Sequence, residues 1–185
     1  PSDKPYLKTG VFDTWKARIP WLLLLMLSAT FTGMIITHFE GVLSFSIALT
    51  AAIPMLMDTG GNCGSQSSVT VIRSLSLGEL HFKDLFKVWW KEARVAVMCG
   101  VTLAVANFVK LLLIERVGVP IALTICLTLC VTVFIAKMVG CTLPILADKL
   151  GFDPAVMASP FITTIVDALA LLIYCGFAGM ILGLA

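Results

Sequence analysis

Long stretches of apolar residues dominate this sequence, and they leave few folds open to it. A helix rises about 1.5 Å per residue, so about 20 apolar residues cross the hydrocarbon core of a bilayer. Five stretches meet that length, and they cover residues 19–38, 41–72, 94–114, 119–146 and 159–184. Only 13% of the residues are charged, about half the fraction of an ordinary soluble domain. The sequence therefore predicts an all-α integral membrane protein with five transmembrane helices.

Basic residues gather in the connections on one side of these predicted spans. Eleven of the thirteen Lys and Arg residues lie within residues 1–18, within residues 73–94, or at Lys137 and Lys149. Since loops rich in Lys and Arg stay on the cytoplasmic side, this split places the N-terminus in the cytoplasm and the C-terminus outside. We therefore expect a multi-pass protein of the cell membrane.

Two segments are amphipathic rather than apolar throughout. Residues 1–18 are polar and mixed in charge, and residues 78–91 alternate Leu and Trp with Lys and Asp. This pattern predicts a cytoplasmic or interfacial N-terminal segment and an interfacial connection between the second and third spans. The chain begins at Pro1 without a signal-peptide core, so we expect a piece of a longer protein, cut before its membrane part.

One carboxylate lies near the middle of the fifth predicted span. Asp167 at the centre of a helix in lipid costs about 2.5–3.5 kcal/mol, so it needs a partner, water or an ion. At helical spacing it shares a narrow stripe of polar or small residues with Ser159, Thr163 and Ala170. This stripe predicts a pore-lining helix. The alternative is a buried Asp whose oxygens accept hydrogen bonds from hydroxyl groups of a neighbouring helix.

The second predicted span contains a polar and glycine-rich run from Asp58 to Ser68, which reads DTGGNCGSQSS. Pro54 and the glycines favour a broken or kinked helix, which at membrane depth is tolerated where it lines a cavity or packs against protein. Freed backbone carbonyls, with Asn62 and Ser65, would offer oxygen ligands in a pore. The alternative is a kinked and closely packed helix that binds no ligand.

The polar groups within the spans are carboxylate, hydroxyl, amide and carbonyl oxygens, which suit Mg²⁺, Ca²⁺ or Mn²⁺. One Asp per chain is few for a divalent ion, and a homodimer with Asp167 near its two-fold axis would supply two. No nucleophile–base pair or zinc-ligand spacing occurs in the sequence, so we expect no enzymatic activity. A net charge of +2 gives no reason to expect a nucleic-acid partner.

Two segments of the sequence resemble a known family. Residues 54–68 read PMLMDTGGNCGSQSS and residues 153–167 read DPAVMASPFITTIVD. They are similar to the second-helix and fifth-helix signatures of the MgtE family of magnesium channels. The resemblance implies a homodimer of five helices per protomer, with a pore along the two-fold axis that is lined by the second and fifth helices.

The resemblance also implies roles for individual residues. Asp167 matches the family's ion-binding aspartate, Thr163 matches a position whose backbone carbonyl helps to hold the hydrated ion, and Gly61 matches a glycine that contacts its water shell. Ser65 and Ser159 stand where the family has pore-lining asparagines, and a serine there shortens the polar reach.

Asp58 stands where some relatives have glycine, and it would add negative charge to the pore, where we also expect Asn62 and Ala170. The family carries regulatory cytoplasmic domains, and none precedes Pro1, so we expect an isolated pore domain.

The leading hypothesis is transport of largely hydrated Mg²⁺ through a dimeric pore, held by Asp167 of both protomers. Mn²⁺, Co²⁺ or Ca²⁺ are expected to be able to occupy the same oxygen ligands. One alternative is an ion-coupled secondary transporter of another cation, since broken helices at the midplane are typical of that class too. The other is a membrane assembly subunit without transport, in which Asp58 and Asp167 hold helices together.

Overall fold

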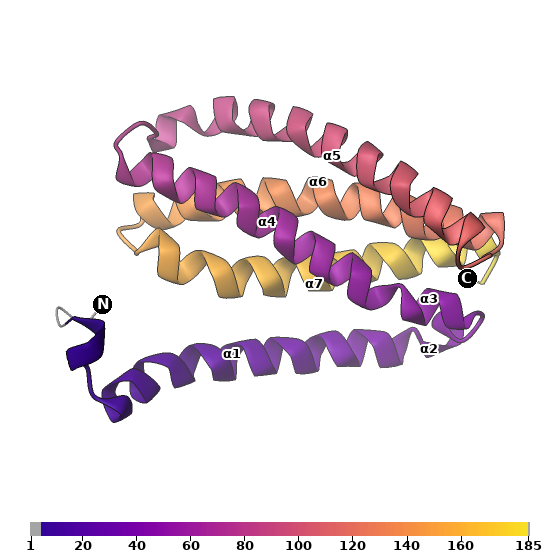
Figure 1. Cartoon of the computed structure of the whole chain (residues 1–185), viewed down its shortest axis with the longest axis horizontal. Coiled ribbons are helices and arrows are strands. Elements are labelled where there is room, and N and C mark those ends of the chain that lie inside the picture. Colours follow the sequence, from indigo (N-terminus) through magenta and orange to yellow (C-terminus); the bar gives the residue numbers. More distant parts are fainter. Residues whose placement is uncertain (1–4, 185) are drawn as a thin grey trace.

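The computed structural model of the chain is a bundle of long helices (Figure 1). It describes residues 5–184, without the side chains of residues 157–159. Within that part there is no β-strand, and the long helices are α1 Val11–His38, α4 Ile53–Ser76, α5 Leu85–Leu113, α6 Val119–Lys149 and α7 Pro154–Leu182. The short helices are η1 Tyr6–Lys8, α2 Glu40–Leu43, α3 Ile47–Ala51 and η2 Phe82–Asp84. The prediction of an all-α protein is confirmed.

Most of the long helices are apolar enough to cross a membrane. Four candidate spans satisfy length and composition among the described residues: α1, η2 with α5, α6, and the part of α7 from Pro160 to Leu182. α4 is the exception, because its polar run lowers its hydropathy although its 24 residues extend about 36 Å. It still crosses the bundle lengthwise beside the other helices (Figure 1). A multi-pass membrane protein is confirmed, with the second of the five predicted spans more polar than the other four.

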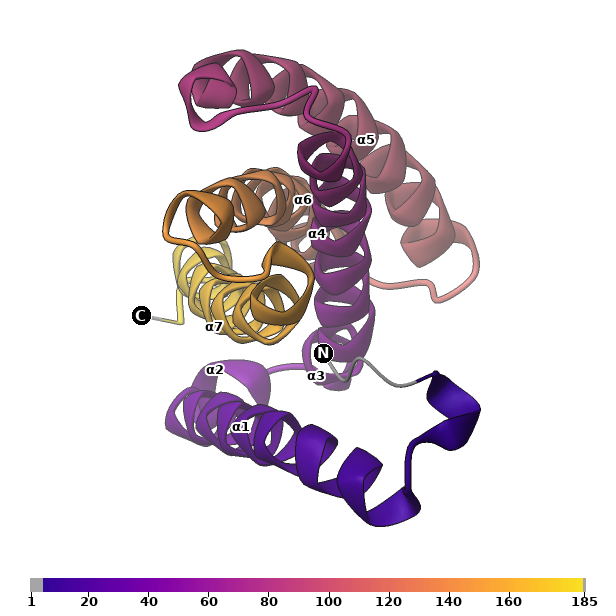
Figure 2. The same ribbon diagram turned by 90° about the vertical axis from the view of Figure 1, so that its left-hand side faces the viewer.

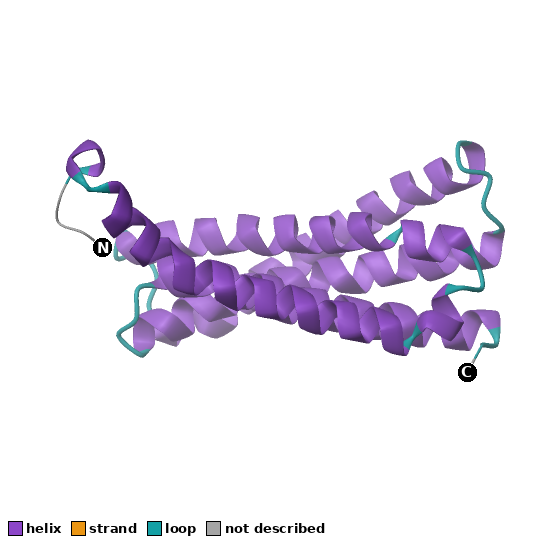
Figure 3. Ribbon diagram, turned by 90° about the horizontal axis from the view of Figure 1, so that it is seen from below, coloured by secondary structure: helices purple, strands orange, loops and turns teal. Residues whose placement is uncertain are grey.

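The central helix of the bundle is α6. Viewed from the end, it lies between α5 and α7, with α4 crossing beside it and α1 at the outer edge (Figure 2). Half of the most apolar stretch of α6 is buried, compared with 11% for α1, so α1 is left largely to the lipid. The two ends of the described chain lie at opposite ends of the long axis (Figure 3), as an odd number of lengthwise helices requires.

The second predicted span, residues 41–72, is interrupted at a different place from the one expected. The chain leaves the helical path at residues 44–46, and α4 then runs unbroken through the whole glycine run. Pro54 occupies the first turn of α4, where a missing N–H and a fixed φ fit a helix, so it starts the helix instead of kinking it. Ser46 caps α3 by accepting a hydrogen bond from the Ala48 amide.

The two amphipathic segments are continuous with long helices instead of lying apart from them. α1 begins at Val11 and includes Pro20, and α5 begins at Leu85, so half of the expected interfacial connection at residues 78–91 forms the first turns of α5. Neither Gly nor Pro follows Leu85 until Gly100, and each added residue of an unbroken helix gains a hydrogen bond.

α4 approaches α6 and α7 through glycines. A Cβ atom at Gly60 would lie 2.8 Å from Cγ1 of Val166 on α7, and one at Gly64 would lie 2.7 Å from Cγ2 of Ile162. A Cβ atom at Gly140 of α6 would meet the backbone carbonyl of Gly64, which no side-chain rotation can relieve. Small residues thus let these helices cross closely, as they do in other membrane bundles.

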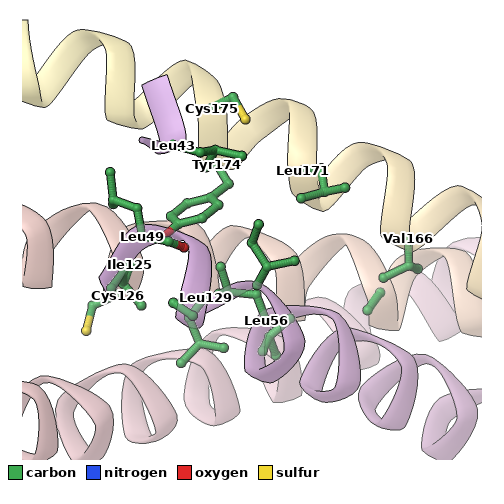
Figure 4. Close-up of a cluster of buried hydrophobic side chains, with 14 of the residues drawn as sticks. Leu43, Leu49, Leu56, Ile125, Cys126, Leu129, Val166, Leu171, Tyr174 and Cys175 are labelled. Atoms are coloured by element: carbon green, nitrogen blue, oxygen red, sulfur yellow. The ribbon is translucent and has the colours of Figure 1, made fainter. Parts of the chain in front are cut away.

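Tyr174 of α7 secures the interruption that precedes α4. Its side chain is fully buried, and its hydroxyl donates a 2.7 Å hydrogen bond to the carbonyl oxygen of Leu49 in α3. Figure 4 shows the ring reaching from α7 toward Leu49, beside Leu43. The last carbonyls of a short helix lack partners within that helix, and lipid offers none. Tyr174 therefore satisfies a backbone group that the interruption exposes.

Replacing Gly140→Ala tests the close crossing of α4 and α6. We expect a loss of about 1–3 kcal/mol of stability, because the added methyl group has to push the α4 backbone away. Thermal unfolding in detergent, followed by size-exclusion fluorescence, would measure the loss. The matched control is Gly33→Ala on α1, where a Cβ atom meets nothing within 4 Å. An equal melting temperature for both variants would contradict the crossing.

Candidate functional site

The two faces of α4 differ sharply in their surroundings. The buried face carries Cys63, Gly64 and Ser67, whereas Asp58 and Ser65 are exposed on the other face. Residues three, four and seven apart share one side of a helix, which places Asp58, Gly61, Asn62 and Ser65 on a single stripe. We call these four residues the α4 stripe. Asp58, Asn62 and Ser65 are exposed, and Gly61 is half-buried.

The α4 stripe offers side chains rather than freed backbone carbonyls. Because α4 is a regular helix throughout the glycine run, its carbonyl oxygens already accept helical hydrogen bonds, so the expectation of unwound backbone ligands is wrong for this chain. Gly61 lies on the stripe with nothing within 4 Å of a Cβ position, and it is half-buried. Gly61 therefore leaves room beside Asp58 and Asn62.

Asp167 lies beside this stripe because its helical neighbours pack on the glycines of α4. Val166 contacts Gly60 and Ile162 contacts Gly64, and Asp167 and Thr163 directly follow these two residues along α7. Asp167 and Thr163 are both half-buried. The negative charge of Asp58 reaches Asp167 through space. Two carboxylates from different helices of one chain thus lie within electrostatic reach of each other.

Among the described residues, none forms an ion pair or a hydrogen bond with the Asp167 carboxylate. A carboxylate held in this way beside a second negative charge requires water or a cation, since burial without a partner is costly. This observation weighs against the alternative in which neighbouring hydroxyl groups satisfy Asp167. No group of three or more His, Cys, Asp or Glu residues gathers within the described part, so one chain alone supplies few metal ligands.

The remaining predicted pore residues occupy different surroundings. Asn62 and Ser65 are exposed on the α4 stripe. Ala170 is only 3% exposed, so it is covered by this chain itself. The side chain of Ser159 lies outside the described residues.

A polar cluster inside the bundle escaped the sequence analysis. Lys137 of α6 is only 4% exposed, and its ammonium donates a 3.5 Å hydrogen bond to the Ser67 hydroxyl. Ser67 in turn donates a 2.6 Å hydrogen bond to the Glu92 carboxylate of α5. From the sequence, Lys137 is counted near the connection between the fourth and fifth spans, but it lies well inside α6, a 31-residue apolar helix. That position was the signal that could have identified it.

Two cavities lie along the groove between α4 and α5. The larger has a volume of about 790 Å³, and the Lys137, Ser67 and Glu92 cluster shares its lining with Asn62 and Ser65 of the α4 stripe. The second, of about 540 Å³, also includes Asn62 in its lining. The α4 stripe and the internal charges therefore open onto the same space.

Cysteine substitution tests whether water wets the α4 stripe. A thiol reacts as the thiolate, which forms in water and not in lipid, so a charged thiol reagent is expected to label Ser65→Cys in the reconstituted protein. The matched control is Ser68→Cys, because Ser68 is only 4% exposed and lies on the buried face. Peptide mass spectrometry separates each site from the native cysteines. Equal and slow labelling of both variants would show that the stripe is dry.

Comparison with known proteins identifies the family of the chain. Residues 53–177 match the family model MgtE, described as a divalent cation transporter. A magnesium transporter MgtE of Thermus thermophilus is 37% identical over 97% of this chain and 40% of its own length. The magnesium transporter MgtE of Bacillus subtilis is 35% identical over 87% of the chain and 36% of its own length. The chain thus spans about 40% of the length of these relatives, and because the family model matches most of it, this chain belongs to the MgtE family.

Proposed function

We propose that this chain forms the ion-conducting part of a Mg²⁺ transport protein. The observation that carries the proposal is Asp167, a carboxylate that forms no ion pair or hydrogen bond with any described residue and that lies within electrostatic reach of Asp58 on the α4 stripe. A polar surface of this kind is costly in lipid unless it faces water or ions. Relatives that cover most of the chain are named magnesium transporters, which supports the same ion.

The stoichiometry of the site supports a homodimer. One chain supplies Asp167 and Asp58, and the α4 stripe remains open on its outer side. A second copy related by a two-fold axis would double the carboxylates and enclose the stripe on both sides, which gives a pore along the axis. In this proposal Asp167 of both protomers binds the ion, and Asn62 and Ser65 line its path.

The chemistry of the stripe suits an ion that keeps its water. Mg²⁺ dehydrates reluctantly and is usually held by one or two carboxylates together with several water molecules. The oxygen atoms available at the stripe are those of short side chains, and Gly61 leaves space where a water shell fits. Mn²⁺, Co²⁺ and Ca²⁺ can use the same oxygens, and Ca²⁺ would need more of them than the site offers. We propose Mg²⁺ as the transported ion on this basis.

The proposed orientation places the N-terminus in the cytoplasm. Lys137 lies inside the bundle and no longer counts as a loop residue, which changes the split of basic residues from eleven against two to ten against two. The positive-inside rule therefore still favours the same direction.

Replacing Asp167→Asn tests the proposed ion site. We expect Mg²⁺ uptake into proteoliposomes to fall at least about tenfold, because the loss of a charge-assisted contact costs about 1.5–3 kcal/mol. A Mg²⁺-sensitive dye trapped in the vesicles measures uptake, and size-exclusion chromatography shows whether the variant keeps its fold and its oligomeric state.

The matched control for this variant is Asp148→Asn, an exposed carboxylate near the end of α6 that lies outside the α4 stripe. It carries the same chemical change and is expected to transport normally. Undiminished uptake by a folded Asp167→Asn variant would remove Asp167 from the mechanism.

A further inference from the structure

A buried pair of opposite charges lies next to the proposed ion path. Lys137 comes from the interior of α6 and Glu92 from α5, and Ser67 of α4 bridges them by hydrogen bonds of 3.5 Å and 2.6 Å. Lys137 is 4% exposed and Ser67 3%, and Glu92 is half-buried. A buried charge is costly unless it is paired, and here the pairing is indirect. Such an arrangement adds less to stability than a direct ion pair would, which calls for another role.

The position of the pair indicates that role. Lys137 and Glu92 line the cavity of about 790 Å³ that also contains Asn62 and Ser65 of the α4 stripe. Charges that share a cavity in a membrane interact strongly, because neither salt nor bulk water screens them as at a surface. The field of this pair therefore reaches ions that pass along the stripe.

We propose that Lys137 and Glu92 form a balanced charge pair that sets cation selectivity along the α4 stripe. The Lys137 ammonium offsets the Glu92 carboxylate, so that the cavity carries no net charge and attracts few monovalent cations. Net attraction for the ion is then left to the carboxylates of Asp58 and Asp167. This inference rests on the proposed transport function, and it assigns a specificity role to residues outside the ion site.

The proposal predicts opposite effects for the two single replacements. Lys137→Met leaves the Glu92 charge unbalanced, so Mg²⁺ uptake should reach half-saturation at lower concentration and a Na⁺ leak should appear. Glu92→Gln leaves the ammonium unbalanced, so uptake should require more Mg²⁺ and no leak should appear. The energy of an ion in a given potential doubles with its charge, so a change of about threefold for Na⁺ corresponds to about tenfold for Mg²⁺.

Two further variants separate charge from structure. The double variant Glu92→Gln with Lys137→Met restores electrical balance, and it should return both the Mg²⁺ dependence and the Na⁺ leak toward the original values. Ser67→Ala removes the hydrogen-bonded bridge without changing any charge, so it should shift selectivity far less than either single replacement. A purely structural network predicts instead that all four variants lose Mg²⁺ uptake without any Na⁺ leak.

The measurement is Mg²⁺ uptake and Na⁺ leak in proteoliposomes of the reconstituted protein. Lys91→Met and Glu79→Gln are matched controls, since both residues are exposed and lie outside the cavity lining. If Lys137→Met does not fold, Glu92→Gln is the deciding variant, because Glu92 is only half-buried. A higher half-saturating Mg²⁺ concentration in Glu92→Gln supports the proposal, and an unchanged or lower one overturns it. The two proposals can be told apart. If the original protein transports Mg²⁺ and loses transport in Asp167→Asn, the proposed function is supported. If Lys137→Met and Glu92→Gln nevertheless shift the half-saturating Mg²⁺ concentration in the same direction, the proposed charge balance is wrong.

Discussion

The close approach of α4 to α6 and α7 is the contact on which the rest of the molecule depends. Gly60 and Gly64 replace side chains with backbone at the crossing, and Gly140 of α6 meets Gly64 directly. Because a helix repeats every 3.6 residues, burying this face forces the α4 stripe onto the opposite one. The same crossing seats Val166 and Ile162, and so places Asp167 beside Asp58. One packing contact thus decides both what is buried and where the carboxylates lie.

The helical architecture could be predicted because apolar length is a strong signal in lipid, and four long helices satisfy it. The place of the break in the second span could not be predicted. Gly and Pro favour irregular backbone in isolation, so a break was expected at the glycine run, but tertiary packing holds Gly60 and Gly64 in a helix. The stripe that Asp167 shares with Thr163 was expected from helical spacing. Gly61 and Ser65 were expected in the pore from the family resemblance, and their common stripe with Asp58 and Asn62 depends on α4 being a regular helix. The burial of Lys137 could not be predicted, because its hydrogen-bonded partners come from α4 and α5, far away in the sequence.

Polar groups in a membrane protein divide here into two kinds. Those that serve the fold are paired inside the chain, as the Tyr174 hydroxyl is with the Leu49 carbonyl. Those of the α4 stripe and Asp167 are left toward the outside, where a second copy and hydrated ions would meet them. The Lys137 and Glu92 pair has features of both kinds. Ser67 joins the two residues inside the chain, and both also line the cavity that contains Asn62 and Ser65 of the α4 stripe. This division is what a pore built from two chains requires, because each chain must fold by itself and remain incomplete at its centre.

A structure of the protein in lipid with Mn²⁺ in place of Mg²⁺ would test the central claim most directly. Mn²⁺ takes the same oxygen ligands and has an anomalous scattering signal that locates it without ambiguity. The account predicts a Mn²⁺ ion on a two-fold axis between two chains, with the Asp167 carboxylates of both protomers facing it through its water shell. Mn²⁺ bound only at sites remote from Asp167, or copies that associate with their α4 stripes facing lipid, would contradict it.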